Sequence, residues 1–198
     1  MSASAIDEHD GLRSWWAAAE LAWAANKSSS DSSDLLDRID YHRQLSAQLP
    51  PATHRVLYTA SGNTLAAARL DDTSAVIEHK LYWAAVSGID EARYLTSILN
   101  SAEVLRRVAP LQAIGLFGAR DFDKNVFHVP IPTYDWSNPK HLDLVKLAAE
   151  AEKAANDVDV TAHTDFKKSR AAVRLKLSSS GIASRIEAAV SALLPAST

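Results

Sequence analysis

Apolar side chains near the beginning of the chain recur at the spacing of a helix. Five of them share one face of a helix expected over residues 10–26, because they follow the i, i+3, i+4, i+7, i+11 pattern: Leu12, Trp15, Trp16, Ala19 and Trp23. We expect the tryptophans to pack in the core against a sheet, or to dock on a missing domain if the chain is a fragment. A second helix is predicted from a cap at Asp31 or Ser33 to Leu49, where two prolines end it.

The middle of the chain has the signature of strands instead. Short apolar runs at 55–60 and 65–70 are separated by Ser-Gly-Asn-Thr, which is typical of a hairpin. After a turn at 71–73, the β-branched and aromatic residues of 75–86 predict a third antiparallel strand. Residues 126–131 predict one more strand, at a sheet edge because of the prolines at 130 and 132.

Helical patterns fill the rest of the chain. Asp90 is expected to cap a helix that reaches Leu99, and a short helix is expected over 103–108. Three closing helices are predicted, with Gly181 between the last two, at 140–158, 165–177 and 182–194. The predicted fold class is α+β, a small and largely antiparallel sheet flanked by N-terminal and C-terminal helices.

The chain has 198 residues, of which 47% are hydrophobic, and this is enough to bury one core. We expect a disordered tail over 1–11 and a single domain over 12–198, helical over 12–49, sheet-containing over 50–138 and helical over 139–198. Cysteine is absent, which excludes disulfides and Cys-ligated metal sites and fits a reducing cytoplasm. The chain shows no signal peptide and no membrane-length apolar run, so a cytoplasmic location without a membrane partner is expected.

Charge is distributed unevenly around a net value of −3. Residues 1–49 hold four basic and eight acidic residues, a net −4, whereas 139–198 hold nine and seven, a net +2. The balance excludes attraction of the whole chain to nucleic acid, so such binding has to come from local patches.

One local patch is the predicted helix after residue 165. From Phe166 to Ile186 six basic residues occur without an acidic one, and Lys167, Arg170 and Arg174 share a helix face, with Lys168, Lys176 and Arg185 extending the run. These cations could neutralise DNA phosphates without reading sequence. The alternative is a solvated face that balances the acidic N-terminal helices.

A second patch is the glycine-containing loop that follows residue 114. It combines Gly115 and Gly118 with Arg120, Lys124 and Asn125 among phenylalanines. Glycine lets the backbone approach a phosphate, arginine can bind phosphate or guanine, and asparagine can read adenine. The alternative is a glycine turn with buried phenylalanines and Arg120 paired to Asp121 or Asp123.

Catalytic motifs are scarce. The chain lacks a glycine-rich phosphate loop, a G-x-S-x-G nucleophile elbow and an H-E-x-x-H zinc motif, and its seven histidines have no metal-ligand spacing. One pattern fits a Mg²⁺-dependent nuclease, in which Asp71 or Asp72 and Glu78 hold the ion and Lys80 stabilises the transition state. The same alternation of charges is typical of a solvated strand face.

Several segments in fixed order resemble the C-terminal region of large N6-adenine DNA methyltransferases of restriction-modification type. The resemblance covers about residues 12–155 and rests on Trp15-Trp16, Asp40-Tyr41, Leu45–Pro50, Val56-Leu57-Tyr58, Ala60-Ser61-Gly62, Tyr94-Leu95, Ile98–Ser101, Gly118-Ala119-Arg120, Phe122-Asp123-Lys124 and Val129–Pro132. A Tyr-Leu helix that ends in Leu-Asn-Ser, followed by a Gly/Arg loop and a Pro-Ile-Pro strand, is a general feature of their target-recognition domains. At position 121 the family often has histidine where this chain has aspartate.

The resemblance implies DNA recognition without methyl transfer. In that family S-adenosylmethionine and the Asn-Pro-Pro-Tyr loop belong to a separate N-terminal catalytic domain, and Asn138-Pro139-Lys140 lacks the second proline and the aromatic residue of that loop. We therefore expect a non-catalytic domain without its own cofactor, whose partners are double-stranded DNA and the methyltransferase catalytic domain. The expected contacts are Gly118, Arg120, Lys124, Asn125, Lys167, Lys168, Arg170 and Arg174. The alternatives are the nuclease and a protein-interaction module.

Overall fold

The computed structural model describes residues 6, 8–115, 118–119, 121–162 and 165–195. The chain divides into two compact units, Met1–Pro50 and Pro51–Thr198. The division falls between two prolines, where the sequence predicts the change from a helical segment to a sheet-containing one. The two units are described separately below, and the prediction of a single domain over 12–198 stays a prediction.

The first unit is helical. It contains α2 (Asp10–Asn26), α3 (Leu35–Ile39) and the 3₁₀ helices η1 (Tyr41–Arg43) and η2 (Ser46–Gln48). The helix predicted over 10–26 is confirmed, and it begins inside the segment 1–11 that was expected to be a tail.

Within the first unit the tryptophans of α2 do not lie in a core, and their packing against a sheet stays a prediction. The structure describes every residue of α2, and none of them is buried. Trp16 and Trp23 are half-buried, whereas the Trp15 side chain is 59% exposed. Within this unit α2 packs on the short α3, which is too small to cover its apolar stripe. The contacts are correspondingly few, and Trp23 Nε1 donates a hydrogen bond to the carbonyl of Ser33 at 3.2 Å.

The second predicted helix is much shorter than expected. Its cap is Asp34, whose carboxylate accepts a hydrogen bond from the Asp37 N–H at 2.7 Å, and not Asp31 or Ser33. It ends at residue 39 because the Asp40 carboxylate accepts hydrogen bonds from the backbone N–H groups of residues 45 and 46, both at 2.9 Å. Such a side-chain turn competes with the helical ladder. The prediction of a helix to Leu49 is therefore wrong.

The second unit is built on an antiparallel sheet. Its strands β1 (Arg55–Thr59), β2 (Ala67–Leu70) and β3 (Leu81–Ala85) lie in the order β2-β1-β3, and Leu57 faces Ala68 on one side and Trp83 on the other. The predicted hairpin and third antiparallel strand are confirmed, and the third strand pairs with β1 rather than with β2. The third strand is shorter than 75–86 because buried Arg55 binds the preceding loop, donating to the carbonyls of Asp72 and Ala75.

Helices follow the sheet and cover one of its faces. They are α4 (Ile89–Leu99), α5 (Ala102–Val108), η3 (Ala109–Leu111), η4 (Asp123–His128), α6 (Pro139–Asn156), η5 (Val160–Ala162), α7 (Phe166–Ser179) and α8 (Ile182–Leu193). The three closing helices are confirmed, and Gly181 has a left-handed φ of +74°, which suits a residue without Cβ. The cap of α4 is Gly88 rather than Asp90.

The strand predicted over 126–131 is wrong. The first half of this segment belongs to the 3₁₀ helix η4, which follows a hairpin of β4 (Ile114–Gly115) and β5 (Gly118–Ala119). Phe122, Val126 and Val129 are buried, at intervals of four and three residues. Such spacing places them on one side of a helical turn, whereas a strand would bury alternate residues.

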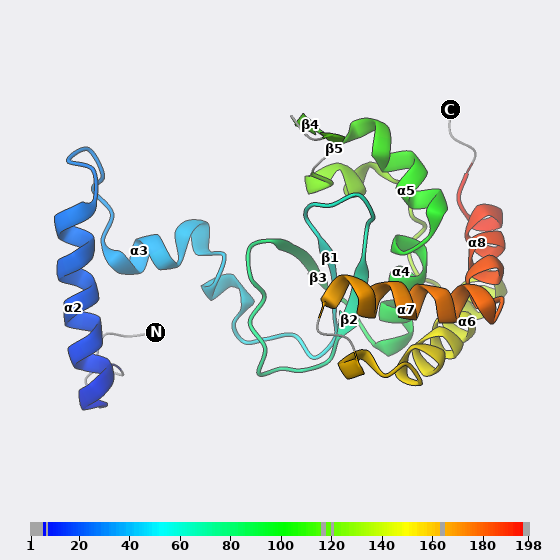
Figure 1. Ribbon diagram of the computed structural model, residues 1–198, viewed down its shortest axis with the longest axis horizontal. Coiled ribbons are helices and arrows are strands. Elements are labelled where there is room, and N and C mark those ends of the chain that lie inside the picture. The colour runs from blue at the N-terminus through cyan, green and yellow to red at the C-terminus, as the bar shows by residue number, and fades with distance from the viewer. Residues whose placement is uncertain (1–5, 7, 116–117, 120, 163–164, 196–198) are drawn as a thin grey trace. The chain divides into compact units, whose positions relative to one another are not determined.

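The core of the second unit lies between the sheet and α4. Val56 and Tyr58 face it from β1, and Tyr94 and Ile98 are fully buried on α4. In the next layer α6 packs on α4, and α8 packs on α6 (Figure 1). The protein is α+β, as predicted. Among its described helices, none combines the length and the apolar composition needed to cross a lipid bilayer.

Candidate nucleic-acid interface

The loop that was predicted to contact DNA is fastened to the end of β1. Phe122 is fully buried, and the backbone N–H groups of Phe122 and Asp123 both donate to the carbonyl of Ala60, at 2.8 and 3.1 Å. One residue earlier, Asp121 forms an isolated bridge with Ser61. We call residues 121–128 the anchored loop. These contacts attach the anchored loop to the residues that follow β1, although none of its described residues belongs to a named strand.

Two tyrosines of the sheet hold Asp123. The Tyr58 hydroxyl donates to the Asp123 carbonyl at 3.0 Å, and the Tyr82 hydroxyl donates to its carboxylate. The hydrogen bond to Asp123 raises the pKa of Tyr82, and burial raises the pKa of Tyr58. Asp123 has a φ of +44°, a strained conformation for a residue with a side chain, and the tyrosines stabilise it.

The predicted DNA-contact residues of the loop differ in their exposure and in their hydrogen bonds. Lys124 is exposed, and its ammonium has no acceptor among the described residues. Asn125 is half-buried, and its amide nitrogen donates to the Leu111 carbonyl at 2.9 Å, so this group braces the loop. Gly118 belongs to β5, while Arg120 lies outside the described residues.

Helix α7 carries the other predicted cations. Asp165 caps it, accepting from the Lys167 N–H at 2.8 Å, and no acidic residue follows within the helix. Lys167, Lys168 and Arg174 are exposed and Arg170 is half-buried. We call Lys167, Lys168, Arg170, Arg174 and Lys176 the basic ridge. In the part of the chain that the structure describes, none of its side chains makes an ion pair.

Five arginines elsewhere in the second unit are paired with glutamates, whereas buried Arg55 binds backbone carbonyls. Arg69 and Arg93 both donate to Glu152, at 2.5 and 2.9 Å, which joins β2 and α4 to α6. Arg106 and Arg107 bind Glu103, and Arg185 binds Glu150. The cations of the basic ridge differ from these arginines because they have no carboxylate partner among the described residues.

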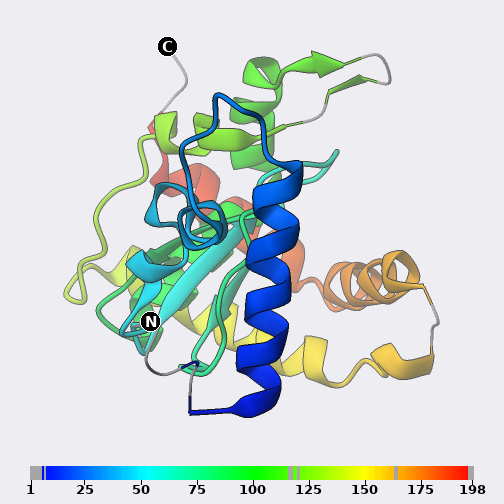
Figure 2. The same ribbon diagram turned by 90° about the vertical axis from the view of Figure 1, so that its left-hand side faces the viewer.

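A neutral turn between β1 and β2 lies next to both candidate groups. Arg174 of the ridge donates to the Thr64 hydroxyl at 2.9 Å, and the anchored loop binds residues 60 and 61 of the same turn. The turn, residues 60–66, carries no charged residue. In Figure 2 it lies on the right between the β4–β5 hairpin above and α7 below. The turn therefore contacts the anchored loop through residues 60 and 61 and the basic ridge through Thr64.

Sequence reasoning missed this turn as part of the site. Ser61, Asn63 and Thr64 were interpreted only as a hairpin connection, because uncharged polar residues between strands are its usual signal. Nothing in the local sequence connects Thr64 with a helix 110 residues further along the chain.

The residues of the nuclease hypothesis do not form a metal site. Glu78 and Lys80 precede β3 instead of lying on a strand, and the Glu78 carboxylate accepts from the Lys80 N–H at 2.9 Å. Asp71 is held by His54 and Arg69. Ser74 donates to the Asp72 carboxylate and lowers its pKa. Among the described residues, no group of three His, Asp or Glu side chains is arranged to bind a metal ion.

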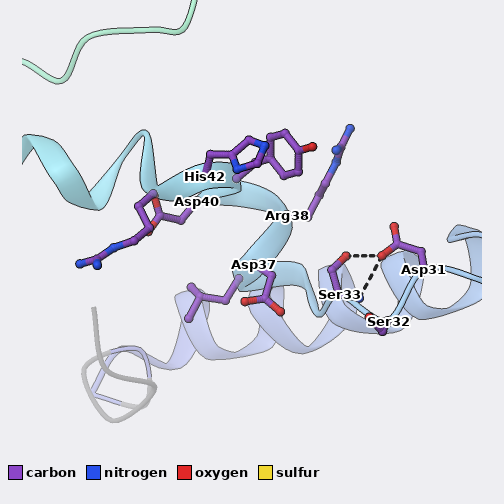
Figure 3. Close-up of a pocket in the computed structure, with 10 residues that line it drawn as sticks. Asp31, Ser32, Ser33, Asp37, Arg38, Asp40 and His42 are labelled. Carbon is purple, nitrogen blue, oxygen red and sulfur yellow. Dashed lines mark hydrogen bonds between the residues drawn. The ribbon is translucent and has the colours of Figure 1, made fainter.

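A polar pocket in the first unit contains none of the predicted residues. It is lined by residues 31–33, 36–38 and 40–43 (Figure 3). The hydroxyl and the N–H of Ser33 donate to the Asp31 carboxylate and lower its pKa, and Asp40 is similarly held by Ser46. These carboxylates thus stabilise turns.

No protein-family model, curated protein or solved structure matches this chain. A functional assignment therefore depends on the arrangement of the chain's own residues.

Proposed function

We propose that this chain is a DNA-binding target-recognition domain of an adenine-N6 DNA methyltransferase or restriction-modification enzyme, and that it is not catalytic alone. The observation that carries the DNA-binding part is the basic ridge, whose cations have no carboxylate partner among the described residues and lie beside an uncharged turn. Unpaired cations on an acid-free helix attract phosphates by releasing the counterions of DNA. The methyltransferase part of the proposal is supported by the sequence resemblance.

In this proposal the cations have a positional role. Lys167, Arg170 and Arg174 contact phosphates along α7, and Lys124 contacts the backbone from the anchored loop. Gly118 and Arg120 remain the candidates for approach to the bases, while Asn125 holds the loop through Leu111. S-adenosylmethionine binds the separate catalytic domain, which is the protein partner, and the chain functions in the cytoplasm.

A salt titration tests the DNA-binding part of the proposal. The full chain is titrated with a labelled 24-base-pair duplex at several salt concentrations, and anisotropy gives the binding constant. We expect roughly four to six released counterions for the native chain. Replacing Lys167, Arg170 and Arg174 with glutamine removes three phosphate contacts, so the slope of log K against log salt becomes shallower by about 3.

A variant of equal charge change on the neighbouring helix provides the control. Lys140, Lys146 and Lys153 are exposed on α6, and their replacement with glutamine lowers the net charge by the same amount. We expect this variant to keep most of the slope. Equal losses in the two variants would show that only net charge matters, and failure of the native chain to bind duplex at low salt would favour a protein-interaction module.

A further inference from the structure

Phe127 is an exposed aromatic residue held in a fixed orientation. Its side chain is 64% exposed, although exposed rings are usually free to change rotamer. The ring meets Tyr58 edge-on at 6.1 Å and 79°, and Tyr82 at 6.2 Å and 89°, and the two tyrosines stack on each other at 5.3 Å. These contacts hold one edge of the ring and leave most of it in solvent.

Lys124 precedes Phe127 by three residues in the anchored loop. Both residues belong to η4, a 3₁₀ helix, in which side chains three residues apart lie almost directly above one another. Lys124 is exposed and its ammonium has no acceptor among the described residues. The anchored loop thus presents a flat apolar group and a cation side by side.

The support beneath Phe127 is unusually rigid for a loop. Phe122 is fully buried below it, and Tyr58 and Tyr82, the residues that contact the ring, also donate their hydroxyl protons to Asp123. The nearest acidic side chain within η4 is therefore already engaged with the sheet. A side chain that must enter a stacked structure benefits from this pre-organisation, because little conformational entropy remains to be lost.

Trp136 provides a useful contrast. It is even more exposed, at 78%, but it follows Asp135 in the chain. Next to it, burial raises the pKa of Tyr134, and the charges of Asp90, Asp135 and Glu91 raise it further. This acidic surrounding repels DNA, so exposure alone does not make an aromatic residue a DNA contact.

We propose that Phe127 is a wedge that inserts between adjacent base pairs of bound duplex DNA while Lys124 binds a neighbouring phosphate. Apolar side chains used in this way unstack a base step and kink the duplex. The inference rests on the proposed function, because it assumes that DNA bound by the basic ridge also reaches the anchored loop. It adds a specific mode of contact that phosphate binding by the ridge does not require.

Duplexes with a weakened base step test the wedge. Binding is measured by anisotropy for a fully paired 24-base-pair duplex and for the same duplex with one central mismatch, which lowers the cost of unstacking. The native chain is expected to prefer the mismatched duplex about tenfold. Phe127→Ala is expected to lose this preference and bind both duplexes equally, while Phe127→Leu, which is still an apolar wedge, keeps most of it.

Trp136→Ala is the matched control and should behave like the native chain. Circular dichroism of each variant verifies that it is folded. Equal affinity of the native chain for both duplexes, or a preference that survives in Phe127→Ala or disappears in Trp136→Ala, overturns the wedge and leaves phosphate binding by the ridge intact. Absence of binding to either duplex overturns the proposed function, and the wedge with it.

Discussion

Two groups of basic residues in the second unit differ in how their charge is balanced. At the edge of the sheet, Arg69 and Arg93 share one partly buried glutamate, Glu152, which joins β2, α4 and α6. On α7 the basic ridge extends into solvent, and the one hydrogen bond that its side chains make among the described residues goes to a neutral hydroxyl, that of Thr64. The first group stabilises the fold, whereas the second keeps its charge available for a partner.

The pKa of Glu152 shows that the ion pairs of the first group stabilise the ionised carboxylate in the folded protein. Burial by itself raises the pKa of Glu152, but the hydrogen bonds and charges of Arg69 and Arg93 outweigh this effect and hold the pKa below its ordinary value of 4.5. Removing one member leaves buried charge uncompensated. The cations of α7 remain hydrated in the folded protein. Replacing them should therefore change the free energy of unfolding little.

The largest expected effect is the loss of stability in Glu152→Ala. The substitution leaves half-buried Arg93 without a carboxylate partner and Arg69 with Asp71 alone, and we expect a decrease of about 2–3 kcal/mol in the free energy of unfolding. Urea titration followed by circular dichroism measures it. Glu150→Ala is the control, because its partner Arg185 is 57% exposed and such pairs contribute less than about 1 kcal/mol. Similar losses of unfolding free energy in both variants would contradict the distinction between a partly buried ion pair and an exposed one.

The second prediction concerns acid. Because the pKa of Glu152 is lower in the folded protein than the ordinary 4.5, its contribution is complete above that pH and is lost as the pH falls through the folded value. Glu152→Gln should therefore lose less stability than the native chain between pH 7 and pH 3.5, as measured by urea midpoints. The glutamine variant of Lys167, Arg170 and Arg174 should follow the native profile, because lysine and arginine do not titrate in this range.

A third experiment gives the cations of the basic ridge a carboxylate partner. Ala171 is exposed on α7, four residues after Lys167 and three before Arg174, so Ala171→Glu supplies the missing carboxylate. Helical pairs of this kind stabilise by a few tenths of a kcal/mol. We expect unchanged or slightly higher stability and a threefold to tenfold weaker affinity for duplex DNA at low salt. Ala171→Gln is the neutral control, and equal affinity of the two variants would argue against a phosphate-binding ridge.

The smallest expected effect is at the beginning of α7. Asp165→Asn keeps a capping oxygen for the Lys167 N–H and removes the acid next to the ridge. Stability should change little, while affinity for duplex DNA at low salt should rise about twofold, because one repulsive charge has gone. Anisotropy and urea titration on the same preparation measure both quantities, and an unchanged affinity would place α7 away from DNA.

The parts of the fold that were predicted correctly depend on local signals. The closing helices follow from apolar spacing and from the break at Gly181, and the β1–β2 hairpin follows from its turn residues. The wrong strand at 126–131 had prolines and β-branched residues that suit an edge strand. It became a 3₁₀ helix because buried Phe122 and the hydrogen bonds to Ala60 determine the course of the chain there.

The candidate site was predictable to a similar extent. Lys167, Arg170 and Arg174 could be assigned to one helix face because three- and four-residue spacing is a local property. The bracing role of Asn125 could not be predicted, since its partner Leu111 lies outside the segment that suggested base reading. The tryptophan stripe of α2 is not buried within the first unit, because an apolar face indicates a partner surface without showing which segment provides it.

The sequence by itself determined the α+β class, the helices at both ends and the acid-free run of cations, because backbone preferences and charge are encoded over a few neighbouring residues. The tertiary structure alone decided which cations are neutralised and which are left free. Arg69 meets Glu152 across 83 positions and Arg174 meets Thr64 across 110, and such pairings arise only when packing of the core brings distant segments together.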